Sequence, residues 1–350
     1  MCKNIGKFQG YDHGTYFIIL AHAIYSNRAF FQVTAFQGGF MITAALSGII
    51  VPLITPFTAD DNFNPAIASG LIEYFLDQGA DALMPTALTG EGPLLSEDET
   101  LAVWDVVFEK TASKKPIVPA IISTTTKRAI RLTRAAEKLG AAAVMIAPII
   151  PELYAGRSQE DVYGFYSDIA VETSLPILLF NYPSLTSVDF TPSLVENLAL
   201  IDNIRYIKES TGDSRRVHAI QRLLGDRIEV ICGAPNVALE SLALGCKVWI
   251  TGTMNAMPRS AKQLMQAVHD VRDLDLARRI YYRHILPFVD IMSRNNNPTG
   301  TIKAGVDARG FDVGSPRRPG SPVSPSDQAR ICKLIKEIGL MEEAESANFH

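Results

Sequence analysis

The sequence predicts an α/β protein, a TIM (β/α)8 barrel followed by a C-terminal helical extension. From about residue 48 onward, short apolar runs alternate eight times with amphipathic stretches of helical period. The runs are apolar on both faces, as parallel strands covered on both sides are. The first run ends in Thr55-Pro56-Phe57. A doubly wound sheet that binds a dinucleotide would usually carry a glycine-rich phosphate turn there.

Strands and helices are expected in strict alternation along the barrel. The predicted strands are residues 48–57, 82–88, 116–122, 142–147, 176–181, 204–209, 228–233 and 247–252. The predicted helices are residues 65–78, 96–111, 127–139, 159–172, 191–200, 214–224, 237–244 and 259–269. Ser96 with Glu99 three residues later predicts a capping box at the start of the second helix.

Three regions are expected along the chain: an N-terminal extension of uncertain structure (residues 1–47), the barrel (48–270) and a C-terminal helical region (271–350). The apolar run Tyr16–Tyr25 is too short to span a bilayer, and Met41 would be a natural start of the folded protein.

The C-terminal region contains two predicted helices with a break between them. A long helix is expected over residues 274–293, followed by an Asn-rich break at 295–297. A Gly/Pro/Ser-rich stretch at 310–325 is either a linker or a loop docked on the body. The final helix, residues 327–338, is expected to stop at Gly339.

Composition argues against several classes of function. The chain is 47% hydrophobic and 20% charged, with a formal net charge of -4. It has no basic stripe for nucleic acid and no apolar run long enough for a membrane span. The six histidines form no metal-binding cluster, so neither a metal nor another cofactor is expected. Four scattered cysteines suit a reducing cytoplasm better than a disulfide framework.

Lys208 is the candidate for covalent chemistry. A TIM barrel carries its active site at the carboxyl ends of its strands, and Lys208 lies near that end of the sixth predicted strand. Strand alternation places it on the same face as Ile204 and Tyr206, toward the barrel interior. A lysine desolvated in an apolar pocket has a lowered pKa and attacks carbonyls as the free amine. The alternative is a lysine paired with a carboxylate such as Glu209.

The turn Thr89-Gly90-Glu91 is a candidate anion-binding element. Gly90 and Gly92 favour a tight turn whose backbone N–H groups lie just before a helix. Such N–H groups hold a carboxylate well, although a short string of this kind also occurs in ordinary β–α turns.

Over roughly residues 48–340 the chain resembles the dihydrodipicolinate synthase and N-acetylneuraminate lyase family. The matching strings are Thr55-Pro56-Phe57, Thr89-Gly90-Glu91, Asn181 followed by Pro183, Ile207-Lys208-Glu209-Ser210-Thr211-Gly212, Gly233, and Asn297-Pro298 with Lys303 downstream. The string around Lys208 is the most specific of these.

The resemblance implies a class I lyase in which Lys208 forms a Schiff base with a 2-oxo acid such as pyruvate. It implies that the substrate lies against Leu88, Thr89, Gly90, Phe180, Asn181, Gly233 and Ile250. It also implies a homo-oligomer, a dimer or a tetramer, with a small-molecule substrate that is pyruvate or a sugar-derived 2-oxo acid.

Several positions depart from the family pattern. Leu88 replaces a hydroxyl residue, Phe180 replaces the tyrosine that relays protons, and Leu185 replaces the arginine that holds a second carboxylate in true synthases. Phe180 has no proton to give, so Tyr182 and Tyr154 are the candidate replacements for the relay.

The sequence therefore predicts a lysine Schiff-base lyase that performs aldol cleavage, dehydration or deamination of a 2-oxo acid. Two alternatives stay open: a true 4-hydroxy-tetrahydrodipicolinate synthase, and a non-catalytic barrel that binds a 2-oxo acid. A metal-dependent barrel lyase is disfavoured because a cluster of ligands is missing.

Overall fold

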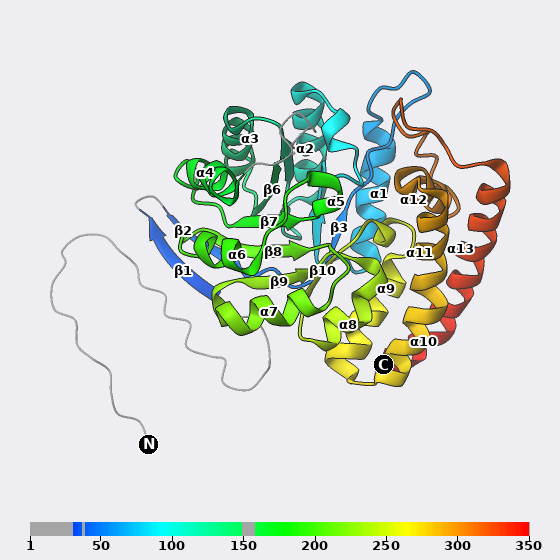
Figure 1. Cartoon of the computed structure of the whole chain (residues 1–350). Helices are drawn as coiled ribbons and strands as arrows, with labels where there is room; N and C mark the ends of the chain where they lie inside the picture. The colour runs from blue at the N-terminus through cyan, green and yellow to red at the C-terminus, as the bar shows by residue number, and fades with distance from the viewer. Residues whose placement is uncertain (1–30, 37–38, 149–157, 350) are drawn as a thin grey trace. The chain divides into compact units, whose positions relative to one another are not determined.

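The predicted TIM barrel is confirmed (Figure 1). The computed structural model describes residues 31–36, 39–148 and 158–349. It divides into two units, Met1–Ala45 and Leu46–His350. In the first unit, β1 (Phe31–Phe36) and β2 (Gly39–Ala44) pair as an antiparallel hairpin. The run Tyr16–Tyr25 lies outside the described residues.

Eight parallel strands form the barrel, in the order β4-β3-β10-β9-β8-β7-β6-β5. A parallel bridge between Leu83 and Ile117 joins β4 to the segment before β5 and closes the ring. The strands are β3 (Gly48–Pro52), β4 (Ala82–Met84), β5 (Ala120–Ser123), β6 (Val144–Pro148), β7 (Ile177–Asn181), β8 (Ile204–Glu209), β9 (Glu229–Cys232) and β10 (Val248–Ile250).

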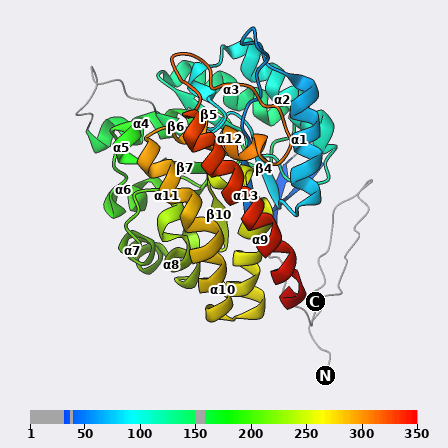
Figure 2. The same ribbon diagram turned by 90° about the vertical axis from the view of Figure 1, so that its right-hand side faces the viewer.

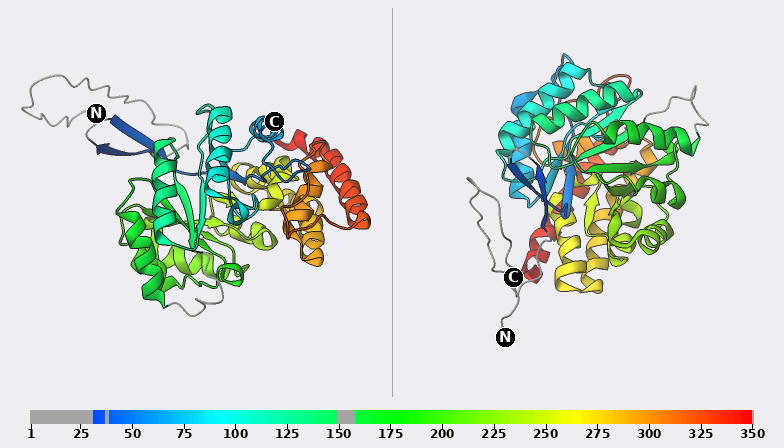
Figure 3. Two further views of the ribbon diagram at one scale, coloured as in Figure 1. Left: turned by 90° about the horizontal axis from the view of Figure 1, so that it is seen from above. Right: turned by 90° about the vertical axis from the view of Figure 1, so that its left-hand side faces the viewer.

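Helices connect the strands and cover the barrel on the outside (Figure 3). They are α1 (Pro65–Asp77), α2 (Glu97–Thr111), α3 (Thr126–Lys138), α4 (Gln159–Ala170), α6 (Pro192–Leu198), α7 (Arg215–Leu224), α8 (Ala238–Ala243) and α9 (Pro258–Gln266), with a short α5 (Pro183–Thr186) after β7. The capping box predicted for Ser96 and Glu99 is present.

Alternate residues of each strand pack into two separate cores. On β10, Val248 and Ile250 point into the barrel, whereas Trp249 packs outward against the helices. On β7, Leu178 and Phe180 point inward and Leu179 outward. This two-sided burial explains why the strands are continuous apolar runs.

One prediction about strand facing was wrong. Tyr206 packs against the inner core beside Lys208, but Ile204 belongs to the outer core instead of sharing their face. The pairing of β7 with β8 passes from Ile177–Ile204 directly to Leu178–Tyr206, so Arg205 is an extra residue. Such a bulge reverses the facing of every residue before it.

The C-terminal region packs four helices against one side of the barrel (Figure 2). These are α10 (Leu274–Ile280), α11 (Leu286–Asn295), α12 (Pro298–Asp307) and α13 (Pro325–Glu345). The single helix predicted over 274–293 is interrupted by a π-helical turn, Tyr281–Ile285. Pro287 lies two residues after that turn and has no N–H for a regular helix.

The final helix does not stop at Gly339, contrary to the prediction. Its buried face continues from Ile331 and Ile335 through Ile338 to Glu342, so packing outweighs the intrinsic cost of a glycine in a helix. The Gly/Pro/Ser-rich stretch before it is a docked loop. Its Val313 carbonyl accepts a hydrogen bond from the Phe57 amide at 3.1 Å.

The N-terminal extension is expected to be dispensable. A chain that begins at Met41 loses β1 and part of β2, but it keeps the whole unit Leu46–His350. We expect turnover to be unchanged and Tm to move by less than about 2–4 °C, which corresponds to roughly 1 kcal/mol. Differential scanning calorimetry of both chains would measure this, and a larger fall in Tm would show that the extension packs on the barrel.

Candidate active site

Lys208 lies at the carboxyl end of β8 in an apolar environment. The residue is only 8% exposed, and its Nζ lies 4.7 Å from the centre of the Phe180 ring. Burial lowers the pKa of Lys208 to about 8. At pH 7 a lysine of this pKa is about one tenth neutral, compared with roughly 0.03% for an ordinary lysine. The site therefore supplies a nucleophilic amine close to neutral pH.

The ring of Phe180 lies beside Lys208, and the ring of Tyr182 lies next to that of Phe180. Phe180 is buried in the inner core, and the centre of its ring lies 6.0 Å from that of Tyr182, with the planes 69° apart. Tyr182 is 37% exposed. Leu185, in α5, is also exposed.

Gly233 provides the space in which Lys208 lies. A Cβ at this position would come within 2.8 Å of Lys208 Cγ and 2.1 Å of Ser210 Oγ. Ser210 is 8% exposed, and its hydroxyl has no hydrogen-bond partner among the described residues. The sequence reasoning did not single out Ser210. The available signal was its spacing, since a residue two positions after Lys208 faces the same side of an extended chain.

The turn at Leu88, Thr89 and Gly90 presents backbone donors at the end of β4. The Leu88, Thr89 and Gly90 amides have no hydrogen-bond partner among the described residues, whereas the Glu91 amide donates to the Leu88 carbonyl at 2.9 Å. The Gly90 carbonyl accepts from Thr55 Oγ1 at 2.6 Å. Adjacent unpaired amides suit a carboxylate.

The segment after β10, two strands away from β4 in the barrel, is close to this turn. A Cβ on Gly252, just after β10, would lie 2.8 Å from Thr89 Oγ1. Ile250 is fully buried in the inner core, and Leu88 packs against the same core. Apolar side chains of the inner core therefore lie beneath the turn.

Asn181 does not join this group. Its Nδ2 donates to Glu209 Oε2 at 2.8 Å, and its Oδ1 accepts from the Phe190 amide at 3.1 Å. Glu209 also accepts from Arg216 Nε at 3.2 Å. Asn181 follows the inward-facing Phe180 and so points outward, where it joins the ends of β7 and β8. The structure thus places it behind the strand and away from Lys208.

Tyr154 lies outside the described residues. Among the described residues, no group of three or more His, Cys, Asp or Glu side chains is arranged to hold a metal ion. In the same part of the chain, no helix is both long and apolar enough to cross a membrane.

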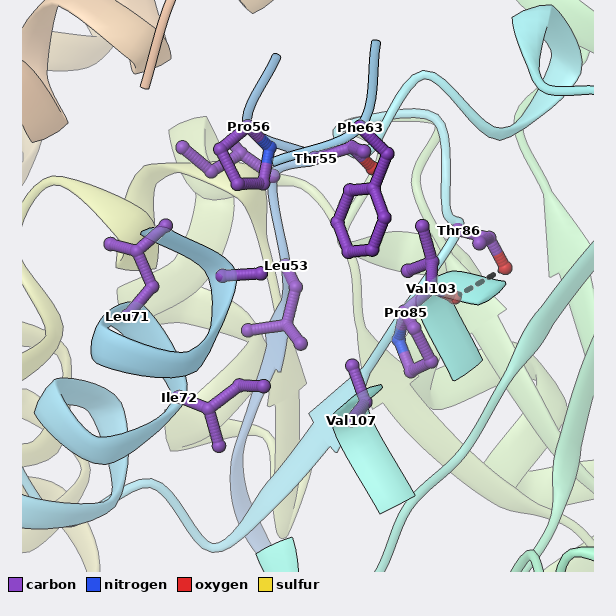
Figure 4. A pocket seen from close by; sticks show the side chains of 12 residues that line it. Leu53, Thr55, Pro56, Phe63, Leu71, Ile72, Pro85, Thr86, Val103 and Val107 are labelled. Atoms are coloured by element: carbon purple, nitrogen blue, oxygen red, sulfur yellow. Dashed lines mark hydrogen bonds between the residues drawn. The ribbon is translucent and has the colours of Figure 1, made fainter. Parts of the chain in front are cut away.

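A small cavity lies away from Lys208, between β3 and the helices α1 and α2 (Figure 4). It measures about 10 Å³ and is lined mainly by apolar side chains that include Leu53, Leu71 and Val107. A water needs at least that volume and two or more polar partners. The cavity is a packing gap in the outer core, too small for a substrate.

Gly233→Ala is expected to impair the site without unfolding the chain. The added methyl would push against Lys208 Cγ and Ser210 Oγ, and a displacement of about 1 Å at a reacting group can cost roughly 10²-fold in rate. We expect kcat/KM to fall by about 10- to 100-fold. Gly164→Ala in α4 is the matched control, because nothing lies within 4 Å of its new Cβ. Equal activity of both variants would contradict the prediction.

Comparisons with known proteins show the family and the fold. The model of the dihydrodipicolinate synthetase family matches residues 45–338. A 4-hydroxy-tetrahydrodipicolinate synthase from Pelobacter propionicus is 31% identical over 84% of this chain and 99% of its own length. The dihydrodipicolinate synthase of Aquifex aeolicus superposes with a TM-score of 0.78 at 29% identity, covering 84% of this chain and 99% of that one.

A second solved structure bears on the ligand. The dihydrodipicolinate synthase of Acinetobacter baumannii, solved in complex with pyruvate, is 28% identical and superposes with a TM-score of 0.78. The match covers 84% of this chain and 99% of that one.

Proposed function

The chain belongs to the dihydrodipicolinate synthetase family, a family of class I lyases, and we propose that it acts on a 2-oxo acid through a Schiff base on Lys208. The observation that carries this proposal is the buried amine of Lys208, with its pKa lowered to about 8, at the same end of the barrel as a turn with unpaired amides. An amine and a carboxylate site at one barrel mouth are what an α-keto carboxylate needs.

The proposed reaction begins with attack of neutral Lys208 Nζ on the C2 carbonyl of the substrate. Loss of water gives a protonated imine, while the amides of Thr89 and Gly90 hold the carboxylate. Cleavage of the C3–C4 bond, or removal of a proton from C3, leaves the electron pair with the imine, which becomes an enamine. Protonation of the enamine carbon and hydrolysis of the imine release the product and regenerate the amine. In aldol cleavage the C4 hydroxyl loses its proton as the aldehyde leaves. In dehydration or deamination the enamine formed by loss of the C3 proton expels hydroxide or ammonia from C4, and hydrolysis of the resulting imine releases the unsaturated product.

The distal part of the substrate would meet an aromatic and apolar wall. Phe180 lies over the amine, Tyr182 packs edge-on against Phe180, and Leu185 is exposed after β7. None of these side chains holds a second carboxylate. We therefore propose a sugar-derived or hydroxyproline-derived 2-oxo acid with a neutral distal end, in which Tyr182 or the Ser210 hydroxyl handles the proton.

Trapping with borohydride tests the proposal. Pyruvate and a panel of longer 2-oxo acids would each be incubated with the protein and reduced, and the peptides would be analysed by mass spectrometry. The expected result is a mass increase on the peptide that contains Lys208. An unmodified Lys208 with an adduct on Lys247 or Lys303 would contradict the assignment.

A true 4-hydroxy-tetrahydrodipicolinate synthase is the second candidate, because relatives such as that of Pelobacter propionicus carry this name. Synthesis condenses pyruvate with aspartate semialdehyde and requires the second substrate carboxylate to be held, for which Leu185 offers no charge. We expect at most a trace of this activity. A rate typical of enzymes, on the order of 10 per second, would instead favour the synthase.

We also propose that the protein is a cytoplasmic homo-oligomer of two or four copies. Free thiols at Cys232, Cys246 and Cys332 suit a reducing compartment, and exposed apolar side chains such as Val171 and Leu200 would gain from burial. Light scattering during gel filtration would give the mass of the assembly. A monomer at micromolar concentration would contradict this part of the proposal.

A further inference from the structure

The turn that presents the Thr89 and Gly90 amides ends at a residue with an unfavourable backbone. Glu91 adopts φ 58°, in the left-handed region, although it is not a glycine. Such a conformation persists only where surrounding contacts fix it. Glu91 is also 5% exposed, so its carboxylate requires partners in the interior. The conformation of the turn therefore depends on whatever holds this side chain.

Both partners of the Glu91 carboxylate come from the C-terminal region. Lys303, in α12, lies 2.9 Å from Glu91 Oε1, and the Arg317 amide donates to Oε2 at 2.7 Å. Lys303 is 2% exposed and has one further polar contact, to the Ser315 carbonyl at 3.0 Å. Its Nζ also lies 4.3 Å from the centre of the Phe57 ring.

The side chain of Arg317 holds in place the loop that carries the Arg317 amide and the Ser315 carbonyl. It forms a two-pronged contact with Glu99 at 2.7 and 3.0 Å and donates to the Asp61 carbonyl at 2.7 Å. Arg317 lowers the pKa of Glu99 to about 2. In Figure 1 the loop between α12 and α13 runs beside the loop after β3, as these contacts require.

We infer that Lys303 is a positioning residue for substrate binding, acting through Glu91 on the turn that holds the 2-oxo acid carboxylate. The inference rests on the proposed function. The inference means that the C-terminal helices influence the affinity for substrate without touching the substrate. A purely structural role would lower stability without a separate effect on the turn.

The test uses the full chain and two independent readouts. The first is the pyruvate concentration that gives half-maximal borohydride trapping. The second is hydrogen exchange of the Glu91 and Gly92 amides, which donate to the Leu88 and Ala87 carbonyls at 2.9 and 3.0 Å. For Lys303→Met we expect the half-maximal concentration to rise at least tenfold, trapping at saturation to be kept, and exchange at the turn to accelerate at least tenfold.

Arg309→Met is the matched control. Arg309 pairs with the buried Glu342 at 3.1 Å, so its loss also leaves a buried carboxylate in the C-terminal region, but it does not contact the turn. We expect both readouts to stay within twofold in this variant. If both variants change equally, general loosening explains the effect and the inference falls.

A double variant covers the case in which Lys303→Met does not fold. Lys303→Met with Glu91→Gln leaves no unpaired buried charge, and we expect it to fold while it retains the raised pyruvate concentration and the faster exchange. Unchanged exchange at Glu91 and Gly92 would overturn the inference. Failure of the wild-type protein to trap pyruvate would count against the proposed function alone, because the exchange measurement needs no substrate.

Discussion

Lys208→Met is expected to abolish turnover, with a loss of at least about 10⁴-fold, because enzymes that lose a covalent nucleophile fall by roughly 10⁴- to 10⁶-fold. Methionine keeps the length and apolar stem of lysine but has no amine to form the imine. Borohydride trapping should disappear together with kcat. The measurement is turnover of the best substrate from the 2-oxo acid panel.

The same substitution should stabilise the fold, since it removes a buried amine. The pKa of Lys208 is lowered from its ordinary 10.5 to about 8, a shift equivalent to about 3 kcal/mol. The sign follows from protonation. Below pH 8 the amine is charged in both the folded and unfolded states, and its burial cost is fully present. Between pH 8 and 10.5 the folded state loses its proton first, so the cost fades. The gain for Lys208→Met should therefore be largest at neutral pH.

Imine formation should follow the same titration. The rate of trapping is expected to rise with pH and to level off above about pH 8, where the folded-state amine is neutral. Lys247→Met, at an exposed lysine next to β10, is the control and should leave trapping and turnover intact. A Lys208→Met enzyme that still turns over would refute the covalent mechanism.

Tyr182→Phe is expected to lower kcat by at least roughly 100-fold, the lower limit of what a general acid–base group contributes. The change removes only a hydroxyl and keeps the ring packed against Phe180. Trapping at Lys208 should survive, because imine formation does not need this phenol. The relevant comparison is kcat against the extent of trapping in the same preparation.

Ser210→Ala separates the two possible proton donors near the amine. Its hydroxyl has no partner among the described residues, and it lies over Gly233 beside Lys208. If Tyr182→Phe keeps a near-normal kcat while Ser210→Ala loses it, the proton passes through the serine. If both variants are active, Tyr154 or ordered water becomes the next candidate.

The barrel architecture and the candidate nucleophile can both be predicted from the sequence. Apolar runs that alternate eight times with amphipathic helices specify a parallel barrel, because each strand is buried on both faces and each helix on one. In such a barrel the active site lies at the carboxyl ends of the strands, and Lys208 is a candidate because it lies near one of these ends. The capping box at Ser96 could also be predicted from the sequence, because Ser96 and its partner Glu99 are only three residues apart.

Features that depend on contacts between distant residues were decided only by the tertiary structure. The bulge at Arg205 turned Ile204 outward, and Asn181 faces Glu209 on the far side of its strand. Helix propensity predicts that the last helix ends at Gly339, but the packing of its buried face extends the helix to Glu345.

The ion pair between Glu91 and Lys303 is the clearest example of this limit. Glu91 lies in the turn after β4 and Lys303 lies in α12, far apart in the sequence, and no local pattern indicates that one holds the other. The lowered pKa of Lys208 is of the same kind, because desolvation depends on every strand around it. Periodicity and capping act over a few residues and can be read in order along the chain. Burial and pairing depend on which residues fold against each other.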